Sequence, residues 1–215
     1  MTAPPEMTRT YRLAMSVCRP LAAWGRLSVE GLEALPTEGP VLVAGNHDSY
    51  YDPLMIGFAG RGRRQIRALA KAELWKVPLL SRVLDGMGQI PIDRGAGDAG
   101  ALEQAIAELR GGACIGVFPE GTRSRGREMR ARSGIARLAL AVPEARLVLV
   151  GVEGTTDFAR FPRRPRVRVR FFEPAGGQTQ DGEEAAALAS RLLGEIRAGV
   201  PPAAVGRARR SRAPA

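Results

Sequence analysis

Hydrophobic positions along the chain fall into short continuous runs, separated by segments in which they recur at helical spacing. The continuous runs predict buried strands, and one segment alternates arginine with valine or phenylalanine, as a half-exposed strand does. Strands are predicted from this pattern at 41–45, 66–70, 88–92, 113–118, 147–152 and, half-exposed, 166–172.

Helical spacing of apolar residues occupies most of the intervening segments. Helices are predicted at 7–25, 53–60, 72–84, 98–110, 132–141 and 183–198, with 72–84 interrupted by proline. The 98–110 helix is the clearest, because Asp98 can cap its start and Gly111 can end it. The 7–25 helix is basic and amphipathic, and it could either pack on the domain or dock onto anionic lipid.

Strands that alternate with helices predict an α/β fold, a single domain with a largely parallel mixed sheet flanked by helices. We expect an N-terminal amphipathic, membrane-docking segment at 1–27, the main domain at 28–199 and a basic, disordered tail at 200–215. Ligands of such sheets bind beyond the carboxyl ends of the strands. The loops after Gly45, Ile92, Phe118 and Val152 are therefore the candidate sites.

The charge and the residue composition of the chain limit the kinds of partner and metal that it is expected to bind. The chain has 32 Lys and Arg against 22 Asp and Glu, a formal net charge of +10. This charge favours an anionic partner such as nucleic acid, acidic lipid, a phosphorylated substrate or an acidic carrier protein. Two separated cysteines and one histidine argue against a zinc site and fit a reducing cytosol. We expect no secretory signal, and no uncharged stretch approaches the ~20 residues of a membrane-spanning helix.

The loop after the first buried strand carries the candidate for general-base chemistry. His47 is the only histidine, and a catalytic histidine is normally oriented by a carboxylate. Asp52 could reach the ring only if His47 lies in a loop and a helix begins near Asp52, and Pro53 is typical of such a helix start. Two alternatives stay open: Asp52 is only a helix cap, or Asp48 is the partner of the imidazole.

Two further clusters follow predicted strands. In the segment from Phe118 to Arg125, Gly121 allows close backbone approach, and Arg123 offers a planar fork suited to phosphate. The third cluster runs from Gly88 to Arg94 and ends with another arginine at a predicted strand end. A salt-bridged surface turn is the simpler interpretation of this cluster. Cys114 lies within an apolar run, which indicates a buried structural thiol instead of a nucleophile.

Taken together, these blocks resemble the glycerolipid acyltransferases, most closely the bacterial 1-acyl-glycerol-3-phosphate acyltransferases. The likeness runs from about residue 28 to about residue 174. The likeness rests on four sequence blocks: Asn46-His47-x-Ser49-x-x-Asp52, Ala70-Lys71-x-Glu73-Leu74, Gly88-x-Ile90-x-Ile92-Asp93-Arg94 and Phe118-Pro119-Glu120-Gly121-Thr122-Arg123. The order and spacing of the blocks make the resemblance specific.

The resemblance implies acyl transfer from an acyl-CoA or acyl carrier protein thioester to a lysophospholipid hydroxyl, chemistry that needs a base but no metal or cofactor. The acyl chains of such an acceptor lie in a bilayer that this chain is not expected to span, so we expect the protein to work at the cytoplasmic side of the membrane, on its surface. It implies that His47 is the base and that Asp52 orients it. It further implies a phosphate site and a set of residues that shape the acceptor site: Lys71, Arg94 and Arg123 for the first, and Glu120, Gly121 and Thr122 for the second. Leu149 stands where the family usually has proline, which leaves substrate selectivity open.

Two other functions each fit part of the sequence. Gly95-x-Gly97-x-x-Gly100, with Glu120 twenty residues further on, matches the spacing of a dinucleotide-binding loop. The charges at Asp93 and Arg94 and the short strand with Pro91 count against that interpretation. Nucleic-acid binding has the charge in its favour, but aromatic residues are only 5% and are not interleaved with the basic runs.

Overall fold

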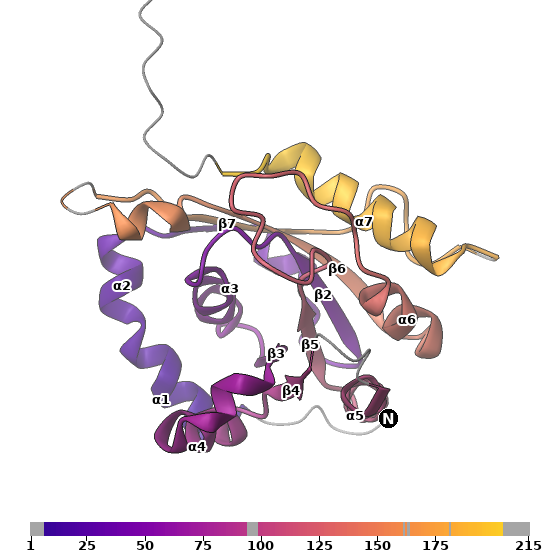
Figure 1. Cartoon of the computed structure of the whole chain (residues 1–215), viewed down its shortest axis with the longest axis horizontal. Helices are drawn as coiled ribbons and strands as arrows, with labels where there is room; N and C mark the ends of the chain where they lie inside the picture. The colour runs from indigo at the N-terminus through magenta and orange to yellow at the C-terminus, as the bar shows by residue number, and fades with distance from the viewer. Residues whose placement is uncertain (1–6, 94–98, 161, 163, 181, 204–215) are drawn as a thin grey trace, which may run out of the picture.

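One sheet organises the molecule, and its strand order is β1-β7-β6-β2-β5-β3-β4 (Figure 1). The computed structural model describes residues 7–93, 99–160, 162, 164–180 and 182–203. Strands β6, β2, β5, β3 and β4 run parallel, whereas β7 pairs antiparallel to β6 and carries β1 parallel to itself. The strands are β1 Ser28–Glu30, β2 Val41–Gly45, β3 Ile66–Lys71, β4 Ile90–Ile92, β5 Cys114–Val117, β6 Arg146–Glu153 and β7 Arg168–Phe172.

Helices cover both faces of this sheet, α5 to α7 on one face and α1 to α4 on the other (Figure 1). The α-helices are α1 Arg9–Val17, α2 Arg19–Trp24, α3 Asp52–Gly60, α4 Pro78–Gly86, α5 Ala99–Arg110, α6 Gly134–Ala141 and α7 Ala185–Gly199. Short 3-10 helices are η1 Leu32–Ala34, η2 Ala72–Lys76 and η3 Thr155–Ala159. The α/β fold with a largely parallel sheet is therefore confirmed.

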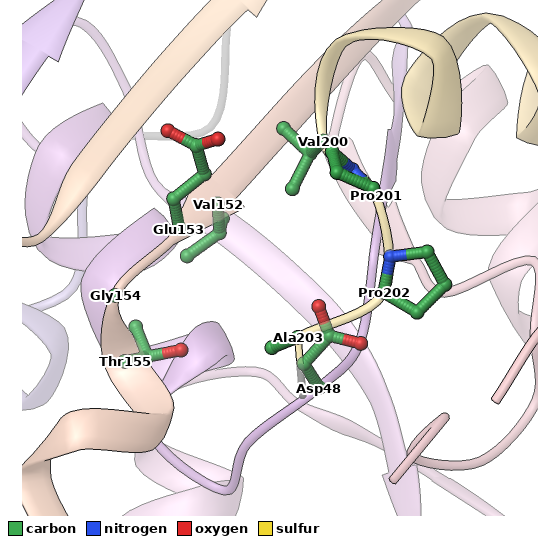
Figure 2. Close-up of a pocket in the computed structure, with 9 residues that line it drawn as sticks. All are labelled: Asp48, Val152, Glu153, Gly154, Thr155, Val200, Pro201, Pro202 and Ala203. Carbon is green, nitrogen blue, oxygen red and sulfur yellow. The ribbon is translucent and has the colours of Figure 1, made fainter. Parts of the chain in front are cut away.

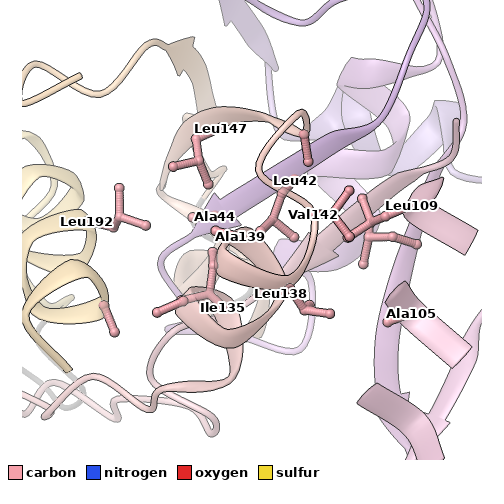
Figure 3. Close-up of a cluster of buried hydrophobic side chains, with 14 of the residues drawn as sticks. Leu42, Ala44, Ala105, Leu109, Ile135, Leu138, Ala139, Val142, Leu147 and Leu192 are labelled. Atoms are coloured by element: carbon pink, nitrogen blue, oxygen red, sulfur yellow. The ribbon is translucent and has the colours of Figure 1, made fainter. Parts of the chain in front are cut away.

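Strand β2 is buried on both faces, which explains its continuous apolar run. Leu42 and Ala44 face the cluster formed with α5, α6 and α7 (Figure 3), and Val41 and Val43 face the cluster formed with α2 and α3. The central position of β2 places the loop that follows it in the middle of the carboxyl edge of the sheet.

Two helix predictions need correction. The single helix expected at 7–25 is two helices that meet at Cys18, because Pro20 lacks an amide hydrogen and occupies the first turn of α2. The segment 72–84 likewise divides into η2 and α4, with Pro78 at the start of α4. The expected cap Asp98 lies outside the described residues.

The edge strands differ in how far the sequence predicted them. β7 is half-exposed as expected, with Val169 and Phe171 buried and the intervening arginines exposed. Its antiparallel direction and the exposed strand β1 were not predicted. Leu149 is fully buried in β6, between Ala44 of β2 and Phe172 of β7. A proline there would remove a hydrogen-bond donor from a strand that is paired on both sides.

Candidate active site

The loops after β2 and β5 meet at the carboxyl edge of the sheet. They do so because β2 and β5 are parallel neighbours, with Val41 opposite Cys114. Backbone and side chain then join the loops: Ser124 N donates to His47 O at 2.8 Å, and His47 N donates to Glu120 Oε2 at 2.8 Å. The loop that carries His47 and the segment from Phe118 to Arg125 therefore form one site.

His47 and Asp52 lie in contact within this site. The distance from His47 Nδ1 to Asp52 Oδ2 is 3.1 Å, and Asp52 is fully buried. The same Oδ2 accepts the backbone amides of Asp48 at 2.6 Å and Ser49 at 2.7 Å, while the Thr155 hydroxyl donates to Oδ1. These donors hold the carboxylate in one orientation, so it acts as the acceptor for a hydrogen on Nδ1.

The alternative that Asp52 merely caps a helix does not fit this geometry. Helix α3 begins at Asp52 itself, with Tyr51 at the N-cap position, one residue earlier than predicted. The Asp52 carboxylate points back to the loop, where its amide donors lie. The N-terminal end of α3 also places partial positive charge beside this carboxylate.

The imidazole of His47 is held on its face as well as at its edge. It stacks on Phe118, with ring centroids 4.2 Å apart and 18° between the planes. Its side chain retains 11% of its accessible surface. Because Nδ1 is engaged by Asp52, Nε2 is the nitrogen left to accept a proton from a substrate hydroxyl.

Asp48, the rival partner, does not contact the imidazole through its side chain. Its carboxylate accepts from Asn46 Nδ2 at 3.2 Å, from the Ser124 hydroxyl and from Arg197, at 2.8 and 3.0 Å. Burial alone would raise the pKa of Asp48, but these hydrogen bonds outweigh it and hold that pKa below its ordinary value. Asp48 is therefore an ionised anchor of the loop.

The three residues expected to shape the acceptor site have different surroundings. Glu120 is 1% exposed, and both of its oxygens are occupied, by His47 N and by Arg197. Burial raises the pKa of Glu120, and Arg197 offsets part of this rise. Gly121 has a φ of 68°, and a Cβ there would lie 2.9 Å from Arg132 Cγ. Thr122 is exposed. Glu120 and Gly121 thus shape the loop from within.

The structure describes two of the three residues that are expected to bind phosphate, Arg123 and Lys71. The Arg123 guanidinium lies over the Tyr50 ring, 3.5 Å from its centroid, and Nη2 donates to the Tyr50 hydroxyl at 2.6 Å. Arg123 is thereby held against the loop that carries His47. Lys71 ends β3 at the same edge of the sheet and forms an exposed ion pair with Glu73 at 2.8 Å. Arg94 lies outside the described residues.

A cavity of about 250 Å³ lies beside Asp48 and Thr155, two of the residues that hydrogen-bond to Asp52 (Figure 2). Its lining includes Asp48, Thr155 and the segment 200–203 that follows α7, with Ala203 next to Asp48. The start of the predicted tail is therefore packed beside the site, whereas residues 204–215 lie outside the described part.

Sequence reasoning missed two residues that hold the pair in place. Thr155 lies in η3 after β6, a loop expected to bear on the site, but nothing singled out its hydroxyl. Arg197 lies in the last turn of α7, and its only sequence signal is a basic residue near a helix end.

The fold places a contacting histidine and carboxylate, an arrangement typical of general-base sites, at the carboxyl edge of the sheet of an α/β domain. Residues 26–157 match the family model described as Acyltransferase, which covers more than half of the chain, and the protein belongs to that family.

Individual relatives agree with this assignment. The chain is 34% identical over 134 residues to a 1-acyl-sn-glycerol-3-phosphate acyltransferase of Borreliella burgdorferi, covering 60% of this chain and 53% of the relative. It is 28% identical over 175 residues to a lyso-ornithine lipid O-acyltransferase of Pseudomonas aeruginosa, covering 72% and 66%. The chain thus spans only part of the length of these relatives.

The fold is also that of a solved structure. The crystal structure of the 1-acyl-sn-glycerophosphate acyltransferase PlsC from Thermotoga maritima matches with a TM-score of 0.68 and 22% sequence identity. The match covers 88% of this chain and 77% of that chain.

Proposed function

We propose that this protein transfers a fatty acyl group from a thioester donor to the free hydroxyl of a lysophospholipid. The proposed acceptor is 1-acyl-glycerol-3-phosphate, and the product is phosphatidic acid. The observation that carries the proposal is the contact between His47 Nδ1 and Asp52 Oδ2 in a member of the acyltransferase family. The names of the relatives support a lysolipid acceptor.

In the proposed reaction, His47 Nε2 removes the proton of the acceptor hydroxyl as its oxygen attacks the thioester carbonyl. The new C–O bond forms, the C–S bond breaks, and the thiolate leaves and takes up the proton. Asp52 stabilises the imidazolium that forms in between. Cys114 is not needed as a nucleophile, since complete burial raises the pKa of its thiol to about 12.

The test is an acyl-transfer assay on purified protein with both donor types, acyl-CoA and acyl carrier protein, and with several acceptors. Phosphatidic acid should form from 1-acyl-glycerol-3-phosphate. Lyso-ornithine lipid belongs among the acceptors, because one relative carries that name. Product from that lipid alone would move the proposal to a different acceptor, and no product from any lysolipid would refute it.

Recognition of the acceptor phosphate gives a first prediction. Arg123→Ala should raise the KM for 1-acyl-glycerol-3-phosphate by about 10-fold or more and spare the donor KM, because a charge-assisted hydrogen bond contributes roughly 1.5–3 kcal/mol. Arg127→Ala is the matched control, an exposed arginine of the same loop. Equal use of phosphate-free acceptors by the wild type would show that Lys71, Arg94 and Arg123 are wrongly assigned.

We further propose that the protein works at the cytoplasmic surface of an anionic membrane. No helix in the described residues is long and apolar enough to cross a bilayer. The 7–25 segment, which is expected to dock, lies beside a second segment with exposed apolar residues, Leu74 to Leu79, since α1 packs beside α4 and the Thr8 hydroxyl donates to Gly86 O at 2.8 Å (Figure 1). Together they expose Leu13, Val17, Leu74, Val77 and Leu79.

Vesicle binding tests this surface. The protein should sediment with anionic vesicles, and high salt should weaken binding, because each basic residue near the surface contributes about 1 kcal/mol. The double variant Leu13→Ser, Val17→Ser should weaken it further and still fold, since these side chains are 68% and 71% exposed. Deleting the whole of 1–25 is less clean, because Tyr11 and Met15 are buried.

Leu140→Ser is the matched control, an exposed leucine of α6 on the opposite face of the sheet. Binding that survives both salt and the double substitution would shift docking to the Leu74–Leu79 segment. No vesicle binding by the intact protein would contradict the proposed membrane surface altogether.

A further inference from the structure

We propose that Arg197 is a positioning residue of this site, which clamps the loops after β2 and β5 together beneath His47. The role rests on the acyl transfer proposed above, because it is defined by the working geometry of His47. It assigns a function to the last helix of the described chain, which lies beyond the sequence blocks of the family resemblance and beyond the matched residues 26–157.

The guanidinium of Arg197 bridges one carboxylate from each loop. Nη1 and Nη2 donate to the two oxygens of Asp48 at 3.0 and 2.8 Å. Nε donates to Glu120 Oε1 at 2.8 Å, and Nη2 contacts the same oxygen. Nη1 also donates to Val200 O at 3.2 Å, which fixes the chain where it leaves α7. The planar fork of arginine suits this double pairing, whereas a lysine ammonium is a single point charge.

Each bridged residue is in turn bonded to the catalytic pair. Glu120 uses its other oxygen, Oε2, to accept the backbone N–H of His47 at 2.8 Å. Asp48 donates its backbone N–H to Asp52 Oδ2 at 2.6 Å, the oxygen that contacts the imidazole. Arg197 thus fixes the backbone of His47 through Glu120 and the Asp52 carboxylate through Asp48. Its effect on the imidazole ring is therefore indirect.

A purely structural ion pair is the simpler explanation, and the same helix supplies an example of one. Arg191 pairs with Glu183 at 2.8 Å and with Glu195 at 3.4 Å, close by in sequence. Arg197 differs in its partners, which lie 149 and 77 residues earlier in the chain and have side chains that are only 3% and 1% exposed. Buried ion pairs are weak sources of net stability, so stability alone accounts poorly for this arrangement.

The experiment compares Arg197→Gln and Arg197→Lys with Arg191→Gln, the matched control on the same helix. Steady-state kinetics gives kcat and both KM values well below each variant's melting temperature. Proton NMR provides a readout that does not depend on turnover. His47 is the only histidine, so a downfield proton of an imidazole Nδ1–H bonded to a carboxylate identifies the pair without further assignment.

Arg197→Gln should lower kcat by about 10- to 100-fold with smaller changes in both KM values, because small displacements of a catalytic group carry losses of this size. The downfield proton should weaken or vanish. The kcat of Arg197→Lys should lie between those of Arg197→Gln and the wild type. If Arg197→Gln does not fold, the test is made with Arg197→Lys alone. Arg191→Gln should lower the melting temperature while leaving kcat and the downfield proton unchanged.

A kcat within about two-fold of wild type, with the downfield proton intact in both Arg197 variants, would overturn the positioning role. So would an equal loss of kcat in Arg191→Gln, since the effect would then be general to α7. Failure of the proposed function looks different: the wild type would transfer no acyl group, while the downfield proton would still report whether Arg197 holds His47 and Asp52 together.

Discussion

His47→Ala is expected to fold normally and to lower kcat by roughly 10²–10⁴, the range for loss of a positioned general base. The fold should survive because the structural bonds of this residue are made by its backbone, which alanine keeps. His47 N donates to Glu120, and His47 O accepts from Ser124. Only the contact with Asp52 and the stacking on Phe118 are lost.

Turnover of His47→Ala is to be measured with saturating donor and acceptor, beside a thermal melt that confirms folding. Phe118→Leu serves as the companion variant, because it removes the stacked ring and leaves the imidazole and its partner. It should reduce kcat far less. Near wild-type turnover in a folded His47→Ala protein would show that another group takes the proton.

The contact between His47 and Asp52 could be predicted from sequence because its signals are local. A single histidine after an apolar run and an Asp-Pro dipeptide five residues later confine both side chains to one loop and one helix start. What the residues alone left open was the choice between Asp48 and Asp52. The structure resolves it through the backbone, since the amides of Asp48 and Ser49 converge on the Asp52 carboxylate.

Arg197 could not be predicted in the same way. Its spacing on α7 fits an ordinary surface position, and its partners depend on how α7 packs across the sheet. The direction of β7 was equally hidden, because alternation reveals which residues of a strand are buried but not which way its neighbour runs. Proline marks the breaks at Cys18 and before Pro78, but apolar periodicity continues across both breaks, and it favoured single helices.

The second large effect is expected at Asp52. Its Oδ2 accepts from His47 Nδ1, Asp48 N and Ser49 N, and its Oδ1 accepts the Thr155 hydroxyl. Asparagine can keep its single oxygen toward the first three donors and turn its amide toward Thr155, whose hydroxyl can also accept. The isosteric change therefore preserves the loop while removing the negative charge beside the imidazole.

Asp52→Asn should consequently lower kcat by about 10- to 1000-fold, less than His47→Ala, because the base remains but its protonated form loses the charge that stabilises it. Both KM values should change little, and the melting temperature should fall only modestly. Asp157→Asn is the control, a carboxylate of η3 that pairs with Arg160 at 2.7 Å. A clearly lowered melting temperature with retained kcat would show that Asp52 holds the loop and takes no part in orienting the base.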